Sequence, residues 1–100
     1  MDPDLPSIMI ADVVRSLAGR DAGKLFYVVG VDDTYLTLVN GKERTLEKPK
    51  QKKRKHTEKV LRPETRLADK LRSGDKVHNS ELRKDLNYLS QHMQSTDLGG

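Results

Sequence analysis

The loop Gly19-Arg20-Asp21-Ala22-Gly23-Lys24 holds the residues whose types and spacing are best suited to binding chemistry. Glycine adopts positive φ at little cost and lets the backbone approach a ligand closely. Two glycines beside Arg20 and Lys24 therefore predict a shaped loop that offers backbone amides and cations to a partner. The alternative is an ordinary structural turn.

Nucleotide-binding motifs do not fit this loop. A P-loop has four residues between its glycines and a Ser or Thr after its Lys, whereas three residues separate Gly19 from Gly23, and Leu25 follows Lys24. The stretch after the loop also has the pattern of a strand, and both the P-loop and the dinucleotide fingerprint need a helix there. We therefore reject nucleotide hydrolysis at this loop.

Positive charge is concentrated in one block of the chain. Residues 42–62 contain ten Lys or Arg and three Glu, while the rest of the chain is slightly acidic within a formal net charge of +4. Such asymmetry is typical of proteins that bind polyanions. A basic run of this kind is otherwise a solvated, mobile segment or, in a eukaryotic protein, a nuclear localisation signal.

Signals for catalysis or metal binding are weak. The three histidines, His56, His78 and His92, lack the spacing of metal ligands. Asp32 and Asp33 are adjacent, which is typical of a turn and not of an acid–base pair. The chain has no cysteine, which excludes disulfides and thiolate metal sites. We therefore expect no enzyme activity, no metal and no cofactor.

The composition indicates one small domain. The chain has 100 residues, of which 34% are apolar and 34% charged, so its core must be thin. The start of the chain lacks the basic and apolar regions of a signal peptide. The longest apolar run, at 25–29, is too short to cross a bilayer. We expect a soluble, cytoplasmic protein.

Strand patterns fill the first half of the chain. The expected strands lie within 12–17 and at 25–31, 35–39, 43–46 and 60–61. Asp32-Asp33 is expected to form a tight turn, and Asn40-Gly41 is typical of a two-residue hairpin turn. Short strands with tight turns favour a small barrel, here over residues 8–61 with the basic run at 48–56.

From Pro63 onward the apolar spacing becomes helical. Pro63 and Glu64 suit the first turn of a helix that Gly74 ends, and Asn79 or Ser80 could cap a second helix. The second helix has one apolar stripe, made of Leu82, Leu86, Leu89 and Met93. The stripe must be buried against the barrel, the first helix or a partner. The helical extension is expected over 62–94, with flexible tails at 1–7 and 95–100.

The order of these motifs resembles a known family. Val14, Gly19, Gly23 and Lys24, followed by Phe26-Tyr27-Val28-Val29, resemble a KOW motif, an RNA-binding element of SH3-like barrels. With Asp32-Asp33, Asn40-Gly41-Lys42, Leu46-Glu47-Lys48-Pro49-Lys50 and the run to Lys55-His56, the series over residues 12–61 is similar to the bacterial KOW-domain RNA-binding proteins and to the fourteen-e ribosomal proteins of the large subunit. The resemblance implies an SH3-like barrel and RNA binding without catalysis, with ribosomal RNA as the target.

We therefore expect an RNA-binding protein that is associated with the ribosome, its assembly or translation. The expected RNA contacts are Arg15, Gly19, Arg20, Gly23, Lys24, Lys48, Lys50, Lys52, Lys53, Arg54, Lys55 and His56. Affinity would be mainly electrostatic, and Tyr35 is the best candidate for an exposed ring that stacks on a base. The alternative is a protein-interaction adaptor, whose partner docks on the Leu82, Leu86, Leu89 and Met93 face. Neither hypothesis involves a membrane.

Overall fold

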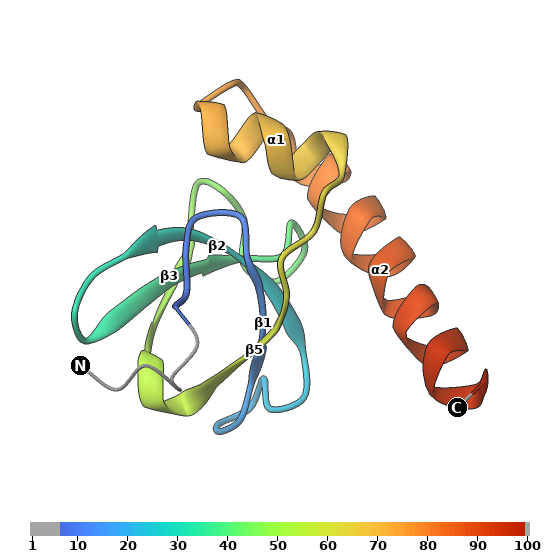
Figure 1. Cartoon of the computed structure of the whole chain (residues 1–100). Coiled ribbons are helices and arrows are strands. Elements are labelled where there is room, and N and C mark those ends of the chain that lie inside the picture. The colour runs from blue at the N-terminus through green and yellow to red at the C-terminus, as the bar shows by residue number, and fades with distance from the viewer. Residues whose placement is uncertain (1–6, 100) are drawn as a thin grey trace.

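The computed structural model describes residues 7–99, with side chains described as far as Met93 (Figure 1). Five strands precede two helices, which confirms the prediction of a mainly β domain with C-terminal helices. The strands are β1 (Val13–Ser16), β2 (Leu25–Val31), β3 (Tyr35–Val39), β4 (Lys50–Lys53) and β5 (Thr57–Leu61). A 3₁₀ turn, η1 (Arg54–His56), joins β4 to β5, and the helices are α1 (Arg66–Ser73) and α2 (Asn79–Gly99).

The strands form one antiparallel sheet in the order β4-β3-β2-β1-β5. Its two outer strands, β4 and β5, are joined by the three residues of η1, so the sheet curls back on itself into a barrel-like body (Figure 1). The register between β2 and β3 shifts at Gly30. A Cβ on Gly30 would lie 2.9 Å from Thr37 Oγ1, so this irregular point in the sheet has no space for a side chain.

One core fills the inside of the curled sheet. Side chains alternate between the two faces of a strand, and one face of β1, β2 and β3 points inward. The inward side chains are each at most 1% exposed: Val14, Phe26, Val28, Leu36 and Leu38. Full burial of a side chain of this size stabilises a fold by about 1.5–3 kcal/mol, so this cluster holds the sheet in its curled form.

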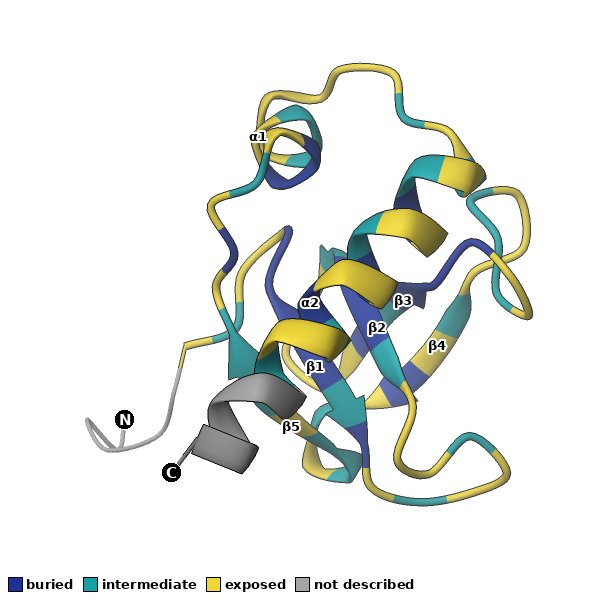
Figure 2. Ribbon diagram, turned by 90° about the vertical axis from the view of Figure 1, so that its right-hand side faces the viewer, coloured by how far each residue is buried: buried dark blue, intermediate teal, exposed yellow. Residues whose placement is uncertain are grey.

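A second core lies between the opposite face of the sheet and the two helices (Figure 2). Val13 and Tyr27 on the sheet are fully buried there. They belong to one cluster with Leu67 and Ala68 of α1 and with Leu82, Leu86 and Leu89 of α2. The middle of β2 is buried on both faces, which agrees with the apolar run at 25–29. The three leucines of the predicted α2 stripe are therefore covered by the chain itself and are not available to a protein partner.

Helix α1 begins and ends at capping residues. Thr65 Oγ1 accepts a hydrogen bond from the Ala68 N–H at 3.1 Å, and Gly74 ends the helix with a φ of +78°. The predicted stop at Gly74 is confirmed. The start lies later than predicted, because Pro63 and Glu64 precede the Thr65 cap and are not part of the first turn.

The segment between β3 and β4 differs from the prediction. Residues 43–46 form no strand, and a loop over residues 40–49 replaces the two-residue hairpin. The Asn40 side chain explains the wider turn, since its Oδ1 accepts N–H bonds from Lys42 (3.0 Å) and Arg44 (2.9 Å). On the side of β3 away from β2, the pairing strand is β4, which lies inside the basic run.

The two ends of the chain are described only in part. The sequence predicts that the helical extension ends at residue 94, whereas α2 continues to Gly99. The expected flexible tails fall mostly outside the description, which omits residues 1–6, Gly100 and the side chains from Gln94 onward. Between these limits, no helix has the length and apolar character needed to span a bilayer.

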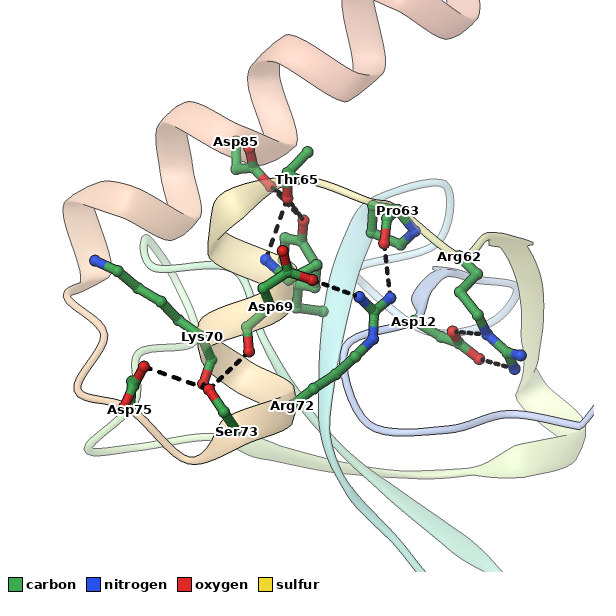
Figure 3. A network of polar contacts seen from close by, with 12 residues as sticks. Asp12, Arg62, Pro63, Thr65, Asp69, Lys70, Arg72, Ser73, Asp75 and Asp85 are labelled. Atoms are coloured by element: carbon green, nitrogen blue, oxygen red, sulfur yellow. Dashed lines mark hydrogen bonds and ion pairs between the residues drawn. The ribbon is translucent and has the colours of Figure 1, made fainter.

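Two polar networks lie near the junction of the sheet and the helical part (Figure 3). Asp85 of α2 accepts hydrogen bonds from the Tyr27 hydroxyl and, at 2.9 Å, from Thr65 Oγ1. Burial raises the pKa of Tyr27, and the bond to Asp85 raises it further. Asp12 is fully buried, yet the Arg62 guanidinium at 2.8 Å helps to hold its pKa below the ordinary value. The Asp85 network joins α2 to the sheet, whereas the Asp12–Arg62 contact joins the segment before β1 to the end of β5. Helix α2 also contacts the loop over residues 40–49.

Candidate nucleic-acid interface

The glycine loop joins β1 to β2 in a fixed shape. Its base is closed by two backbone bonds, from Ser16 N–H to Lys24 O (3.0 Å) and from Gly23 N–H to Ser16 O (2.7 Å). Gly19 and Gly23 have φ values of +84° and +89°. This region of φ favours glycine, which confirms that the two glycines shape the loop.

Asp21 anchors the loop to β4. One carboxylate oxygen accepts hydrogen bonds from Ser16 Oγ at 2.8 Å and Lys52 Nζ at 2.7 Å, and the other lies 3.3 Å from Lys50 Nζ. Lys52 also donates to the Ala18 carbonyl at 2.6 Å. Burial would raise the pKa of Asp21, but the bonds from Lys52, Ser16 and Lys50 outweigh it and hold that pKa well below its ordinary value. The carboxylate therefore stays charged and the loop stays attached.

This contact corrects the role predicted for Lys52. The sequence places Lys52 among the RNA contacts of an exposed run, but its side chain is 8% exposed and serves the loop as an internal counter-ion. A buried ammonium must be paired in this way, since an unpaired one is strongly destabilising. Lys50 also contacts Asp21, although 27% of its side chain remains exposed.

Beside Asp21 the glycine loop and the 40–49 loop enclose a hollow of about 220 Å³. Its lining combines four cations, two carboxylates and one ring: Arg20, Lys24, Arg44, Lys50, Asp21, Glu43 and Phe26. Arg20 is exposed, and the Lys24 side chain is half exposed. Lys50 is paired with Asp21 and is only 27% exposed, so we take Arg20, Lys24 and Arg44 as the cations of the hollow that are more accessible to a ligand.

Glu43 positions one of these cations. Its carboxylate accepts a bond from Asn40 Nδ2 at 3.1 Å and one from Lys24 Nζ at 3.2 Å. The Asn40 bond, followed by the Lys24 contact, lowers the pKa of Glu43 below its ordinary value. The Lys24 ammonium is therefore held at the junction of the two loops. Arg44 belongs to the basic block at 42–62 but is not among the predicted RNA contacts. The fold of the 40–49 loop brings it to the hollow.

The rest of the basic run lies at the other end of β4. Lys53, Arg54 and Lys55 border a shallow depression of about 370 Å³ with Asp33 and Thr34. Lys53 and Lys55 are exposed. Arg54 holds the turn between β2 and β3, since Nη1 donates to the Asp32 carbonyl at 2.9 Å. The run is thus divided between the two ends of one strand.

Three other predicted contacts have separate surroundings. Arg15 forms an ion pair with Glu58 at 3.1 Å. Lys48 is exposed in the 40–49 loop. The carbonyl of His56 accepts a bond from the Leu17 N–H at 2.9 Å, so His56 helps to close the base of the glycine loop through its backbone. None of the three lines the hollow.

The exposed rings are Tyr35 and Tyr88, which are 37% and 52% exposed. Tyr35 lies directly opposite Lys53 in the sheet, next to the outlying cations. Tyr88 is on α2, where its ring contacts that of His92 at a centroid distance of 4.1 Å. The sequence singled out Tyr35 alone, because the exposure of Tyr88 depends on which face of α2 packs on the sheet.

Asp32 stabilises the turn between β2 and β3. Asp32 Oδ1 accepts the N–H bonds of Thr34 (2.8 Å) and Tyr35 (2.6 Å), which confirms that this aspartate belongs to a turn. These bonds hold the pKa of Asp32 below its ordinary value. Across residues 7–93, no three His, Cys, Asp or Glu side chains lie together in a way that could hold a metal ion. A scan of protein-family models and a search of curated proteins find no match to this chain.

Proposed function

We propose that the protein binds RNA through the hollow between its glycine loop and its 40–49 loop. The observation that carries the proposal is the set of three cations, Arg20, Lys24 and Arg44, that line one hollow on loops that internal hydrogen bonds hold in place. Cations bind phosphate regardless of sequence, and a rigid arrangement of them favours one backbone shape over another. Folded RNA, whose backbone takes defined shapes, suits such a site.

The wider assignment is part of the same proposal. The motif order over residues 12–61 resembles the KOW-domain RNA-binding proteins, and the barrel-like sheet is compatible with that resemblance. We accordingly propose ribosomal RNA as the target and a cytoplasmic role at the ribosome or in its assembly. The adaptor alternative has less support, because the α2 leucines it required are buried.

The proposal is tested with a double variant, Arg20→Ser and Arg44→Ser, in titrations of a labelled RNA hairpin at several salt concentrations. If both side chains contact phosphate, the slope of log affinity against log salt should fall by roughly 0.7 to 0.9 per lost contact. The matched control is Arg66→Ser with Lys76→Ser, which removes the same charge from exposed positions in the helical part.

Three outcomes decide the matter. A lower slope for the loop variant and an unchanged slope for the control would support the hollow as the site. Equal losses for both variants would mean that only net charge matters, and the hollow would lose its role. Cosedimentation of the parent protein with ribosomal subunits, reversed by salt, tests the ribosomal part, and hairpin binding without cosedimentation would overturn that part alone.

A further inference from the structure

We infer that RNA bound at the hollow continues across the 40–49 loop onto α2, so that the helix provides a second half of the interface. This inference rests on the proposed function. A second depression, of about 370 Å³, lies between the 40–49 loop and α2, and we call it the α2 groove. Lys24 lines both the hollow and the α2 groove, so the two sites adjoin at this side chain.

The α2 groove has donors suited to an RNA backbone. Lys24, Lys42 and Arg83 provide positive charge, and Asn87 and Ser90 add an amide and a hydroxyl. Side chains of these types make most protein contacts to phosphate and sugar oxygens, and the ribose hydroxyl of RNA can both donate and accept. A docked protein would instead need a buried aromatic or aliphatic anchor site, and the apolar side chains here are limited to Leu25 and Leu86.

The loop and the helix form one rigid wall of this groove. Arg83 Nη1 donates to the Gly41 carbonyl at 2.7 Å, which uses one of the five donors of the guanidinium. Asn79 Oδ1 accepts the Leu46 N–H at 2.9 Å, and Asn79 Nδ2 donates to Glu47 at 2.9 Å. The Gly41 bond holds the Arg83 guanidinium against the loop, and its four remaining donors can serve a ligand.

The next residue along the helix offers an internal comparison. Lys84 is exposed like Arg83, but it lines a different depression, of about 470 Å³, between α1 and α2. The α2 residues that line the groove (Arg83, Asn87, Ser90) and those that line the α1–α2 depression (Lys84, Asp85, Tyr88) lie on opposite flanks of the buried leucines of α2, as the helical spacing requires. Removing one charge at either position changes the net charge equally, so the two variants differ in the face of the helix and in the Arg83 bond to Gly41.

The experiment compares Arg83→Gln with Lys84→Gln, and Asn87→Glu with Gln91→Glu, by hairpin titration over a range of salt. Loss of a charged hydrogen bond to phosphate should weaken binding by about fivefold or more, and Arg83→Gln should lower the salt slope by roughly 0.7 to 0.9. Lys84→Gln and Gln91→Glu should stay within about twofold of the parent. Asn87→Glu keeps the Arg83 contact with Gly41, so it acts through charge in the groove and not through a displaced loop.

The outcomes separate this inference from the proposed function. If the Arg20 and Arg44 variant loses affinity but all four α2 variants bind like the parent, RNA stops at the hollow and the inference is wrong. If Arg83→Gln and Lys84→Gln lose affinity equally, the helix acts only through net charge, which also overturns it. If the parent protein binds neither the hairpin nor ribosomal subunits, the proposed function itself fails.

Discussion

The Lys52 ammonium lies 2.7 Å from the Asp21 carboxylate, and this ion pair joins the edge strand β4 to the glycine loop. Alternate residues of a strand share one face, so Lys50 and Lys52 both point toward Asp21 while Gln51 and Lys53 point away. A stretch of cations can therefore form a strand here, because the Asp21 carboxylate lies against the inner face of β4, where an apolar side chain would otherwise pack.

Asp21→Asn should destabilise the protein. The amide keeps the size of the carboxylate, but it leaves the Lys52 charge in a position that is 8% exposed without its counter-ion. Removal of one partner of a buried pair costs about 3 kcal/mol, measured as a lower free energy of unfolding in urea. Asp33→Asn, at an exposed position, should change that free energy by less than about 0.5 kcal/mol. Equal stabilities would show that the ion pair contributes nothing to the fold.

The same carboxylate should make stability depend on acid. The pKa of Asp21 is lower in the folded protein than its ordinary value of 3.8, so its contribution is complete above that value and declines as the pH falls below it. The measurement is urea unfolding between about pH 5 and pH 2, a range that brackets the ordinary pKa of 3.8. Over this range the parent should lose stability more steeply than Asp21→Asn. Parallel pH profiles would contradict the assignment.

Gly23→Val should damage the glycine loop through conformation alone. A Cβ at Gly23 would meet no atom within 4 Å, but its φ is +89°. That φ costs a residue with a side chain about 1–2 kcal/mol, and the cost is greatest for a β-branched residue. Gly23→Asn should cost clearly less, because asparagine tolerates positive φ. Thermal unfolding of both variants checks the order, and a Val variant as stable as the Asn variant would refute it.

Gly41→Ala tests the close approach of the 40–49 loop to α2. Its φ is +77°, and an added Cβ would collide with the Asn79 carbonyl and lie 3.0 Å from the Leu82 Cβ. Gly74→Ala is the matched control, since Gly74 has a φ of +78° and open space around it. Strain alone should cost about 1 kcal/mol at either site, and the collision should add about 1–3 kcal/mol at Gly41 only. Denaturant unfolding should separate the two variants, and equal losses would mean that the loop moves away freely.

The fold could be predicted from the sequence where local pattern decides it. The apolar strands β2 and β3 and the Gly74 stop were predicted at their observed positions, because alternation, β-branching and a C-terminal glycine act over a few residues. β4 could not be predicted from local pattern, since its inner cations are paired with Asp21, which lies 31 residues before Lys52 in the chain. Likewise, Asn40-Gly41 has the sequence of a tight hairpin, but the Asn40 side chain and the packing of Gly41 on α2 favour a wider loop.

The candidate site shows the same limit. The glycine loop with Arg20 and Lys24 was visible as a motif, whereas the presence of Arg44 beside them follows from the course of the 40–49 loop. Charge counts also could not distinguish Lys52, which is buried, from Lys53, which is exposed on the next position of the same strand. The charge pattern identified the basic block at 42–62. Which of its cations are buried and which are exposed depends on the alternation of side chains along β4.

Lys53→Ser with Lys55→Ser should show whether the outlying end of the basic run takes part in RNA binding. Both side chains are exposed beside Tyr35 and the turn at Asp33, at the other end of β4 from the hollow. The substitutions leave the Lys52 contact with Asp21 in place, so the melting temperature should stay near that of the parent. If both cations contact phosphate, the salt slope should fall by roughly 0.7 to 0.9 for each.

These two cations should not select among RNAs. Contacts to phosphate carry no sequence information, so their loss should weaken a hairpin and an unstructured strand of equal length by similar factors. The Arg20 and Arg44 variant should instead lose more affinity for the hairpin, because those side chains lie on loops of fixed shape. Titrations of both variants against both RNAs measure the difference. An unchanged salt slope in the Lys53 and Lys55 variant would confine the interface to the hollow and the α2 groove, because the far end of β4 would then contact no phosphate.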